Sequence, residues 1–311
     1  NSTSYYFSVA SGSIGEFFDE MYLNTPWEQH YENLDGRTIL DRLASVKYFV
    51  VKSNRYQYMP YGYYWLEGSA EKNGKIYEAF GSEEALPLGY TYDSFIPREE
   101  YEKMTVTEKQ QALLQGIVLE DSSLPEITPE FNDQEIPFEI RKGKGCTVKD
   151  GKIKVTKEGA KLELLFNGLE NSETYLIAEG LDYDGLSPKD RVSEKKWNKM
   201  TRYEQNQLLH EDSHWRYWKE SQKASITVGG QFPEKTIRIF TDKYNAYSGK
   251  HNFLCNTGYE KAAKQSITLT FEKPGVYTFD KLKIVCQPME RITKQTEKLN
   301  QEVLTDIRMD T

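Results

Sequence analysis

The chain has 311 residues, of which 38% are hydrophobic and 28% charged, and its formal net charge is -8 at pH 7. This length suffices for two ordinary domains or one large β-rich domain with a sizeable core. Nucleic-acid-binding proteins cluster Lys and Arg to neutralise phosphates, so the acidic balance argues against nucleic acid as a partner. No apolar run is long enough to span a bilayer. The first residues carry neither a Met nor a leader pattern, and we expect the chain to be part of a longer protein.

The beginning of the chain predicts a small α/β unit over residues 1–122. Apolar residues at helical spacing predict a short amphipathic helix within residues 12–23, and a second helix is expected over residues 37–44. An unbroken run of apolar, β-branched and aromatic residues then predicts a buried strand over residues 48–51.

Two more strands of this unit are expected within residues 75–82 and 85–96, where apolar and polar residues alternate. Residues 123–134 are rich in Pro, Asp and Glu and show little periodicity. This composition predicts a linker between the α/β unit and the rest of the chain.

The second half predicts an antiparallel β-sandwich, jelly-roll-like, over residues 135–288. Short alternating runs recur there with turn residues between them, and Asp150-Gly151 is typical of a hairpin turn. A polar helical insertion is expected at about residues 187–221, and a polar helical segment over residues 289–311. The predicted fold class is therefore α+β.

The pattern K-M-T-x-x-E occurs twice, with Thr105 and Glu108 in the first copy and Thr201 and Glu204 in the second. A Thr followed three residues later by Glu forms a capping box, in which each side chain pairs with a backbone amide at the start of a helix. The spacing between the copies and the sequence around them do not support an internal repeat. Both copies therefore predict helix starts.

The second copy runs into a formal match to the H-E-x-x-H zinc-protease motif. His210 and His214 would lie on one face of the helix, with Glu211 available as a general base. However, the two intervening positions are Asp and Ser, whereas the zinc-protease helix is normally apolar there. We interpret the segment as an exposed helix, with no metal or cofactor predicted and these two histidines as weak metal candidates.

Two aromatic clusters are candidate binding sites for a carbohydrate or another acceptor, because the apolar faces of a pyranose stack on aromatic rings. One lies in a Tyr-rich stretch and the other in the helical insertion; the candidates are Tyr61, Tyr63, Tyr64, Trp65, Trp215 and Trp218. The alternative is that these rings pack across strand faces or against the sandwich.

Three cysteines, Cys146, Cys255 and Cys286, are spread along the second half of the chain and form no C-x-x-C motif. A zinc knuckle or thioredoxin-type site is therefore not expected. One long-range disulfide and three buried free thiols are both compatible with the sequence.

Four stretches together resemble the extracytoplasmic part of the YfhO family, large polytopic membrane proteins of Gram-positive bacteria. The resemblance is most specific at residues 83–121 and does not extend to residues 187–221. The stretches are "NSTSYYFSVASGSIGEFF", "LASVKYFVVKS", "EALPLGYTYDSFIPREEYEKMTVTEKQQALLQGIVLED" and "KLKIVCQPMERITKQTEKL".

The resemblance implies a GT-C-like membrane glycosyltransferase, which takes a sugar from a polyprenyl-phosphate carrier at the outer face of the cell membrane. The implied acceptor is a cell-wall polymer such as lipoteichoic acid, and the implied partner is the protein's own transmembrane region. No residue here corresponds to the family's catalytic loop, so no catalytic residue is assigned. In this context Tyr61, Tyr63, Tyr64 and Trp65 would contact a sugar or lie at the lipid headgroup level.

Two alternatives from other classes remain open from the sequence. One is a carbohydrate-binding or adhesion module of the cell surface. The other is a zinc hydrolase built on His210, Glu211 and His214.

Overall fold

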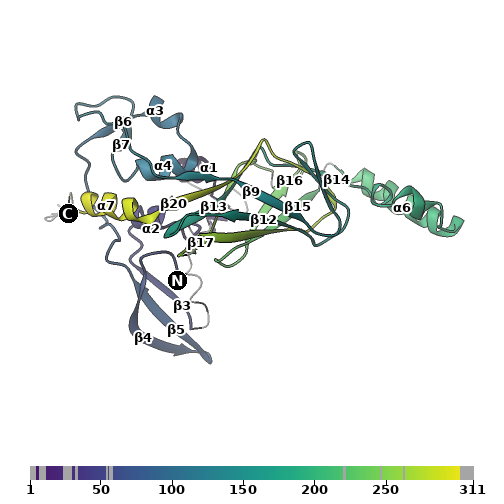
Figure 1. The fold of residues 1–311 in the computed structure, drawn as a ribbon, viewed down its shortest axis with the longest axis horizontal. Coiled ribbons are helices and arrows are strands. Elements are labelled where there is room, and N and C mark those ends of the chain that lie inside the picture. The colour runs from purple at the N-terminus through teal and green to yellow at the C-terminus, as the bar shows by residue number, and fades with distance from the viewer. Residues whose placement is uncertain are drawn as a thin grey trace.

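The computed structural model describes residues 5–6, 12–23, 30–31, 34–53, 55, 59–219, 222–245, 247–261 and 263–301. A β-sandwich forms the centre of the molecule, with an α/β unit at one end and a helical arm at the other (Figure 1). A separate three-stranded sheet projects from the side of the α/β end. The predicted α+β class with an antiparallel sandwich is confirmed.

Two facing sheets make the sandwich, and a third sheet closes one end. The first has the strand order β16-β15-β18-β12-β9, the second β17-β13-β20-β8, and the third β10-β11-β19-β14. Their bounds are β8 Gln134–Ile136, β9 Phe138–Lys142, β10 Cys146–Lys149, β11 Lys152–Val155, β12 Ala160–Asn167, β13 Ser172–Glu179, β14 Asp182–Gly185, β15 Lys223–Gly229, β16 Lys235–Phe240, β17 Phe253–Glu260, β18 Lys264–Phe271, β19 Gly275–Thr278 and β20 Lys281–Pro288. The expected turn at Asp150-Gly151 joins β10 to β11, with positive φ at both residues.

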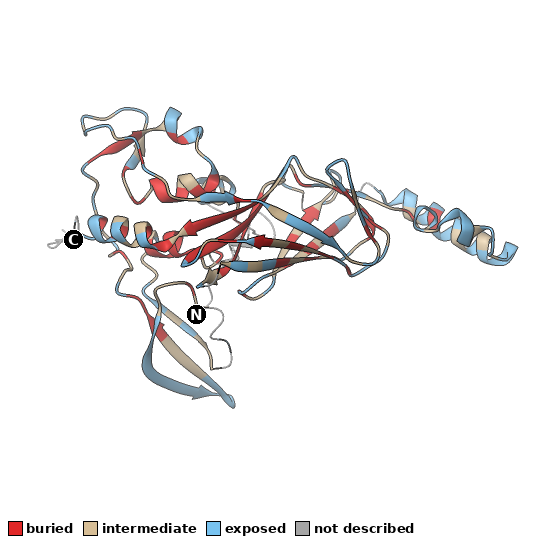
Figure 2. Ribbon diagram, in the orientation of Figure 1, coloured by how far each residue is buried: buried red, intermediate tan, exposed pale blue. Residues whose placement is uncertain are grey.

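The two central sheets differ in how they are buried, and the sequence reflects this. In β12, buried residues alternate with more exposed ones, as expected for a strand with one face on the core. In β13, seven consecutive residues are buried. Leu176 and Ala178 face the sandwich core, while Tyr175 and Ile177 pack with Val106 of the α/β unit. The α/β unit therefore covers the outer face of this sheet, and the two share a buried junction (Figure 2).

Short helices and strands build the α/β unit, and the C-terminal helix completes it. Its elements are β1 Tyr5–Tyr6, α1 Gly12–Glu20, β2 His30–Tyr31, α2 Thr38–Leu43, β6 Phe95–Pro97, α3 Arg98–Glu102, α4 Val106–Ala112, β7 Ile117–Leu119 and α7 Met289–Leu299. In α7, Met289, Ile292 and Leu299 join a buried cluster with Ile39 and Leu86.

The strand expected over residues 85–96 is limited to its end, where β6 begins at Phe95. Pro87 and Gly89 interrupt the alternating run, because proline cannot donate to a ladder and glycine weakens a strand. Within the predicted linker, Ile127 and Phe131 pack against the core of the α/β unit. The side-chain amide of Asn132 donates to the carbonyl of Pro288 over 2.9 Å.

The projecting sheet consists of β3 Tyr48–Lys52, β5 Lys75–Gly81 and β4 Tyr64–Lys72, in that order. The prediction of a strand at 48–51 is correct, but the prediction that it is buried is wrong. Tyr48 and Val50 are more than half exposed. The sheet has no second layer over this face among the described residues, so the apolar run that predicted burial lies at the surface (Figure 2).

Both predicted capping boxes are confirmed. Thr105 caps α4 and Thr201 caps α6 Arg202–Tyr217, each with the reciprocal contact from the Glu three residues later. The arm at the far end consists of η2 Lys189–Arg191, α5 Glu194–Trp197 and α6. The predicted helical insertion at 187–221 is therefore present, and it extends away from the sandwich (Figure 1).

Buried polar residues join the α/β unit to the sandwich. The fully buried carboxylate of Glu173 on β13 accepts hydrogen bonds from the backbone amide and hydroxyl of Thr38, at the start of α2, and from the hydroxyl of Tyr175. Arg37, which precedes the helix, has no side-chain cap of its own. A carboxylate from the sandwich thus satisfies the first amide of a helix in the other unit. The boundaries at 122, 134 and 288 stay a prediction.

Candidate functional site

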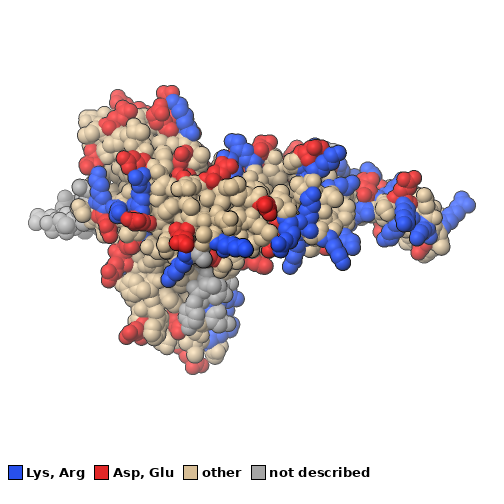
Figure 3. Space-filling model, in the orientation of Figure 1, with Lys and Arg blue, Asp and Glu red and all other residues tan. Residues whose placement is uncertain are grey.

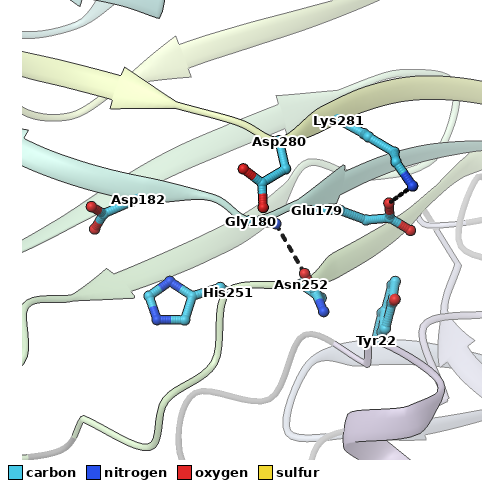
Figure 4. A pocket seen from close by; sticks show the side chains of 8 residues that line it. All are labelled: Tyr22, Glu179, Gly180, Asp182, His251, Asn252, Asp280 and Lys281. Carbon is cyan, nitrogen blue, oxygen red and sulfur yellow. Dashed lines mark hydrogen bonds and ion pairs between the residues drawn. The ribbon is translucent and has the colours of Figure 1, made fainter.

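An open pocket of about 680 Å³ lies at one edge of the sandwich, where several strands begin or end. Its lining comes from the end of β13, the start of β14, the segment before β17 and the start of β20. Tyr22, two residues after α1, completes it. The lining residues are Tyr22, Glu179, Gly180, Asp182, His251, Asn252, Asp280 and Lys281 (Figure 4). They are widely separated in the sequence, and the fold brings them together.

The position of the Asp280 carboxylate depends on a glycine. Gly180 has a φ of +61°, and a Cβ on it would overlap the Oδ2 of Asp280. A residue with a side chain would therefore both strain the backbone and displace this carboxylate. The amide of Gly180 donates to the Oδ1 of Asn252 over 3.0 Å, which turns the Nδ2 group of that side chain away from Gly180 (Figure 4).

The side chain of Glu179 lies between Lys281 and Tyr22. Its Oε2 lies 3.4 Å from the Nζ of Lys281, and the ring of Tyr22 lies near its carboxylate (Figure 4). Burial, followed by the charge of Glu179, raises the pKa of Tyr22 above 10.0, so this phenol stays protonated at neutral pH and acts as a donor.

A buried arginine holds Tyr22 at the pocket. Arg37 is fully buried and donates to the carbonyls of Met21, Tyr22 and Leu254, at 2.6, 3.5 and 3.3 Å. In addition, the amide of Leu254 donates to the carbonyl of Tyr22 over 3.0 Å. These hydrogen bonds fix the backbone of Tyr22 against Leu254 of β17.

His251 maintains the shape of the loop. Its Nδ1 lies 3.0 Å from the carbonyl of Leu181 and its Nε2 lies 3.0 Å from the hydroxyl of Tyr247. A carbonyl can only accept, so Nδ1 carries a proton and donates it to Leu181. Both ring nitrogens are therefore used by the protein.

The pocket lining combines three carboxylates with one Lys, one amide and one phenol. Such groups accept and donate hydrogen bonds to hydroxyl groups, and the negative balance opposes the binding of a phosphate. Among the described residues, no group of three or more His, Cys, Asp or Glu is placed to hold a metal ion. The chemistry of the pocket fits a neutral or cationic polyhydroxylated ligand.

The sequence alone does not reveal these pocket residues. Each is a common residue type in a strand or turn, and no motif links positions so far apart. The only local signal is the glycine at 180 directly after the apolar run of β13, which indicates a tight turn at a strand end.

The four aromatic candidates around β4 do not form one platform. The ring of Tyr61 packs 4.7 Å from that of Tyr259, and Tyr63 packs 4.7 Å from Phe49 while its hydroxyl donates to the carbonyl of Val46. Tyr64 and Trp65 are 47% and 51% exposed, but as consecutive residues of a strand they point to opposite faces.

The candidates in the arm are also divided. Trp215 is half-buried against the end of the sandwich, where a Cβ on Gly185 would lie 2.7 Å from its ring. Trp218 is 52% exposed and packs its ring 5.0 Å from that of Tyr217. Trp215 therefore attaches the arm to β14, and Trp218 remains open to solvent.

His210 and His214 lie exposed on α6, on the turns that the sequence predicted. Within the described part of the chain, no third metal-binding side chain joins them. Of the two alternatives for the cysteines, the structure has the free thiols: Cys146, Cys255 and Cys286 are all buried and form no disulfide.

Comparison with known protein families gives a match that covers nearly the whole chain. The match is to a family of bacterial membrane proteins. Residues 1–310 fit the family described as bacterial membrane protein YfhO, and the chain therefore belongs to the YfhO family. No curated protein matches the chain. None of the described helices is both long enough and apolar enough to cross a membrane.

Proposed function

We propose that this chain is the extracytoplasmic part of a membrane glycosyltransferase and that it binds a sugar at the pocket formed where β13 ends and β20 begins. The transfer itself would take place in a membrane region of the full protein, from a polyprenyl-phosphate carrier to a cell-wall polymer such as lipoteichoic acid. Membership of a membrane protein family supports the location, and the composition of the pocket supports the ligand.

The observation that carries the proposal is the set of side chains around Gly180. The carboxylate of Asp280, the amide group of Asn252 and the phenol of Tyr22 offer both acceptors and donors at the rim of the same pocket. Sugar hydroxyls need this mixture, because each hydroxyl donates one hydrogen bond and accepts others. The lining is too acidic to attract the phosphates of a carrier or teichoic acid, so it would hold a neutral sugar unit.

Titration calorimetry with neutral and phosphorylated probes tests the proposal. We expect the chain to bind a neutral disaccharide, such as maltose or N,N′-diacetylchitobiose, more tightly than glycerol phosphate. Asp280→Asn should weaken this binding about tenfold or more, because a hydrogen bond to a charged group is lost. The matched control is Glu163→Gln on β12, whose side chain pairs with Arg141 outside the pocket.

Two results would contradict the proposal. One is the absence of binding to every neutral sugar, which would favour a scaffold role for the chain. The other is an equal loss of binding in the control variant. A cell-surface binding module would use the same pocket; it would differ in having a coding sequence without a series of apolar segments long enough to span a bilayer.

A further inference from the structure

One face of the projecting sheet carries a continuous apolar strip next to the body of the protein. Tyr48 and Tyr64 lie in register on either side of Gly81. Leu66 closes the space between them, because a Cβ on Gly81 would lie 3.0 Å from its Cδ2. Tyr48 is 58% exposed, Tyr64 47% and Leu66 38%, so the strip crosses all three strands at the surface.

Further from the body, the same face becomes cationic. Because alternate residues of a strand share a face, Val50 and Ala79 follow the strip, and Lys52 with Tyr77 come next. Lys72 and Lys75 form the last pair before the turn. None of these three lysines forms an ion pair with a described carboxylate.

Two acidic residues of the strands, Glu71 and Glu78, lie on the opposite face. Glu78 is in register with Ser69, and Glu71 with Ile76, one position out of phase with the lysines. Glu67 lies in the bulge between Trp65 and Ser69, and Glu83 after β5 meets the hydroxyl of Tyr64 at the edge. The two faces therefore differ in charge although the whole chain is acidic.

The combination of exposed tyrosines, aliphatic residues and lysines distinguishes this face from a protein-binding surface. Tyrosine is enriched both in protein interfaces and at the polar layer of a membrane, whereas lysine is depleted in protein interfaces and common on surfaces that lie on a membrane. Lysine side chains can extend to phosphates while their stems cover apolar surface. The sheet projects clear of the sandwich, and the visible part of this lobe shows mostly uncharged surface (Figure 3).

We propose that the Tyr48–Tyr64 face of β3, β4 and β5 lies flat on the anionic headgroup layer of a lipid bilayer. The tyrosines and Leu66 would enter the boundary between headgroups and acyl chains, and Lys52, Lys72 and Lys75 would pair with lipid phosphates. The charge separation between the two faces carries this proposal, and the membrane protein family provides a bilayer for the face to contact.

Vesicle sedimentation of the chain tests this proposal separately from sugar binding. We expect binding to vesicles of phosphatidylcholine with phosphatidylglycerol, weaker binding to phosphatidylcholine alone, and a decrease with added salt. Each lysine near an anionic surface contributes about a fivefold factor to partitioning. Lys72→Gln combined with Lys75→Gln should therefore weaken binding about 30-fold. Both positions flank an exposed turn, and circular dichroism checks that the variant folds.

The matched control neutralises the opposite face, with Glu71→Gln and Glu78→Gln in one variant. This control should leave vesicle binding unchanged or slightly stronger. Three results would overturn the proposal: no binding to phosphatidylglycerol vesicles, an equal loss of binding in the two variants, or a concentration-dependent dimer that the lysine variant abolishes. The last result would assign the face to a second copy of the chain.

Discussion

Replacement of Glu173 by alanine should lower the free energy of unfolding by about 3–5 kcal/mol, because the side chain serves both parts of the molecule. In the folded protein its carboxylate accepts from the Thr38 amide at 3.3 Å, the Thr38 hydroxyl at 2.5 Å and the Tyr175 hydroxyl at 2.6 Å. The Thr38 amide would lose its acceptor, and the two hydroxyls would keep only their longer contacts, from Thr38 to the carbonyl of Tyr61 at 3.5 Å and from Tyr175 to the Oε1 of Gln287 at 3.3 Å. An unsatisfied buried donor costs about 1–3 kcal/mol, so the orphaned amide and the two weakened hydroxyl contacts together exceed the effect of a typical substitution.

Glu173→Gln should cost much less, about 1 kcal/mol. The amide keeps an oxygen for Thr38, and the hydroxyl of Tyr175 can rotate to accept from the new NH₂ group. Urea unfolding at pH 7, followed by tryptophan fluorescence and circular dichroism, measures both variants. Glu163→Ala, which breaks a surface ion pair, is the control and should cost less than about 1 kcal/mol.

Two results for the Glu173 variants would contradict this role of the carboxylate. If Glu173→Ala destabilised the protein no more than Glu163→Ala, the carboxylate would not cap α2 across the junction. If the Gln and Ala variants were equally destabilised, charge and not hydrogen bonding would be the important property of this residue. Either result would refute the role of these hydrogen bonds in holding the α/β unit on the sandwich.

Three further predictions concern other buried groups. Burial, and next the charge of Glu173, raises the pKa of the Asp41 carboxyl well above 3.8. The stabilising contribution of Asp41 is therefore complete below pH 3.8, where the carboxyl is protonated in both states, and is lost as the pH rises. In urea unfolding, Asp41→Asn should accordingly gain stability relative to the parent from pH 4 upward. Asp212 accepts from Arg216 and from the amide of Lys189 at 2.7 and 2.9 Å, so Asp212→Ala should make the arm at 187–221 sensitive to limited proteolysis while the far-ultraviolet spectrum of the strands is retained. A thiol reagent at pH 8 should label no cysteine in the folded protein and three after unfolding, because all three are buried and burial raises the pKa of the Cys146 and Cys255 thiols.

Features set by neighbouring residues were predictable from the sequence. The capping boxes at Thr105 and Thr201 need only a Thr and a Glu three positions apart, and both begin helices. The turn at Asp150-Gly151 needs only two residues that adopt positive φ. In these cases the local pattern and the tertiary structure agree.

Features that depend on distant segments were not predictable in the same way. The apolar run at 48–51 reads as buried, but whether a second layer covers a strand is decided elsewhere in the chain. The pocket unites residues from Tyr22 to Lys281, and none of them belongs to a motif. Likewise, the cap of α2 is Glu173, far from the helix in sequence, so inspection of the residues around Arg37 does not reveal it.

The packing of α7 on the α/β unit has a consequence for the order of events during synthesis. Ile39 and Leu86 emerge from the ribosome early, whereas Met289 and Ile292, which complete their cluster, emerge only after every strand of the sandwich. The guanidinium of Arg42 likewise donates a hydrogen bond to the hydroxyl of Thr296 over 3.0 Å, and this acceptor is synthesised only with α7. The α/β unit therefore cannot complete its core before α7 has been synthesised. Until then its apolar surface is exposed, and it can bind chaperones or misassemble.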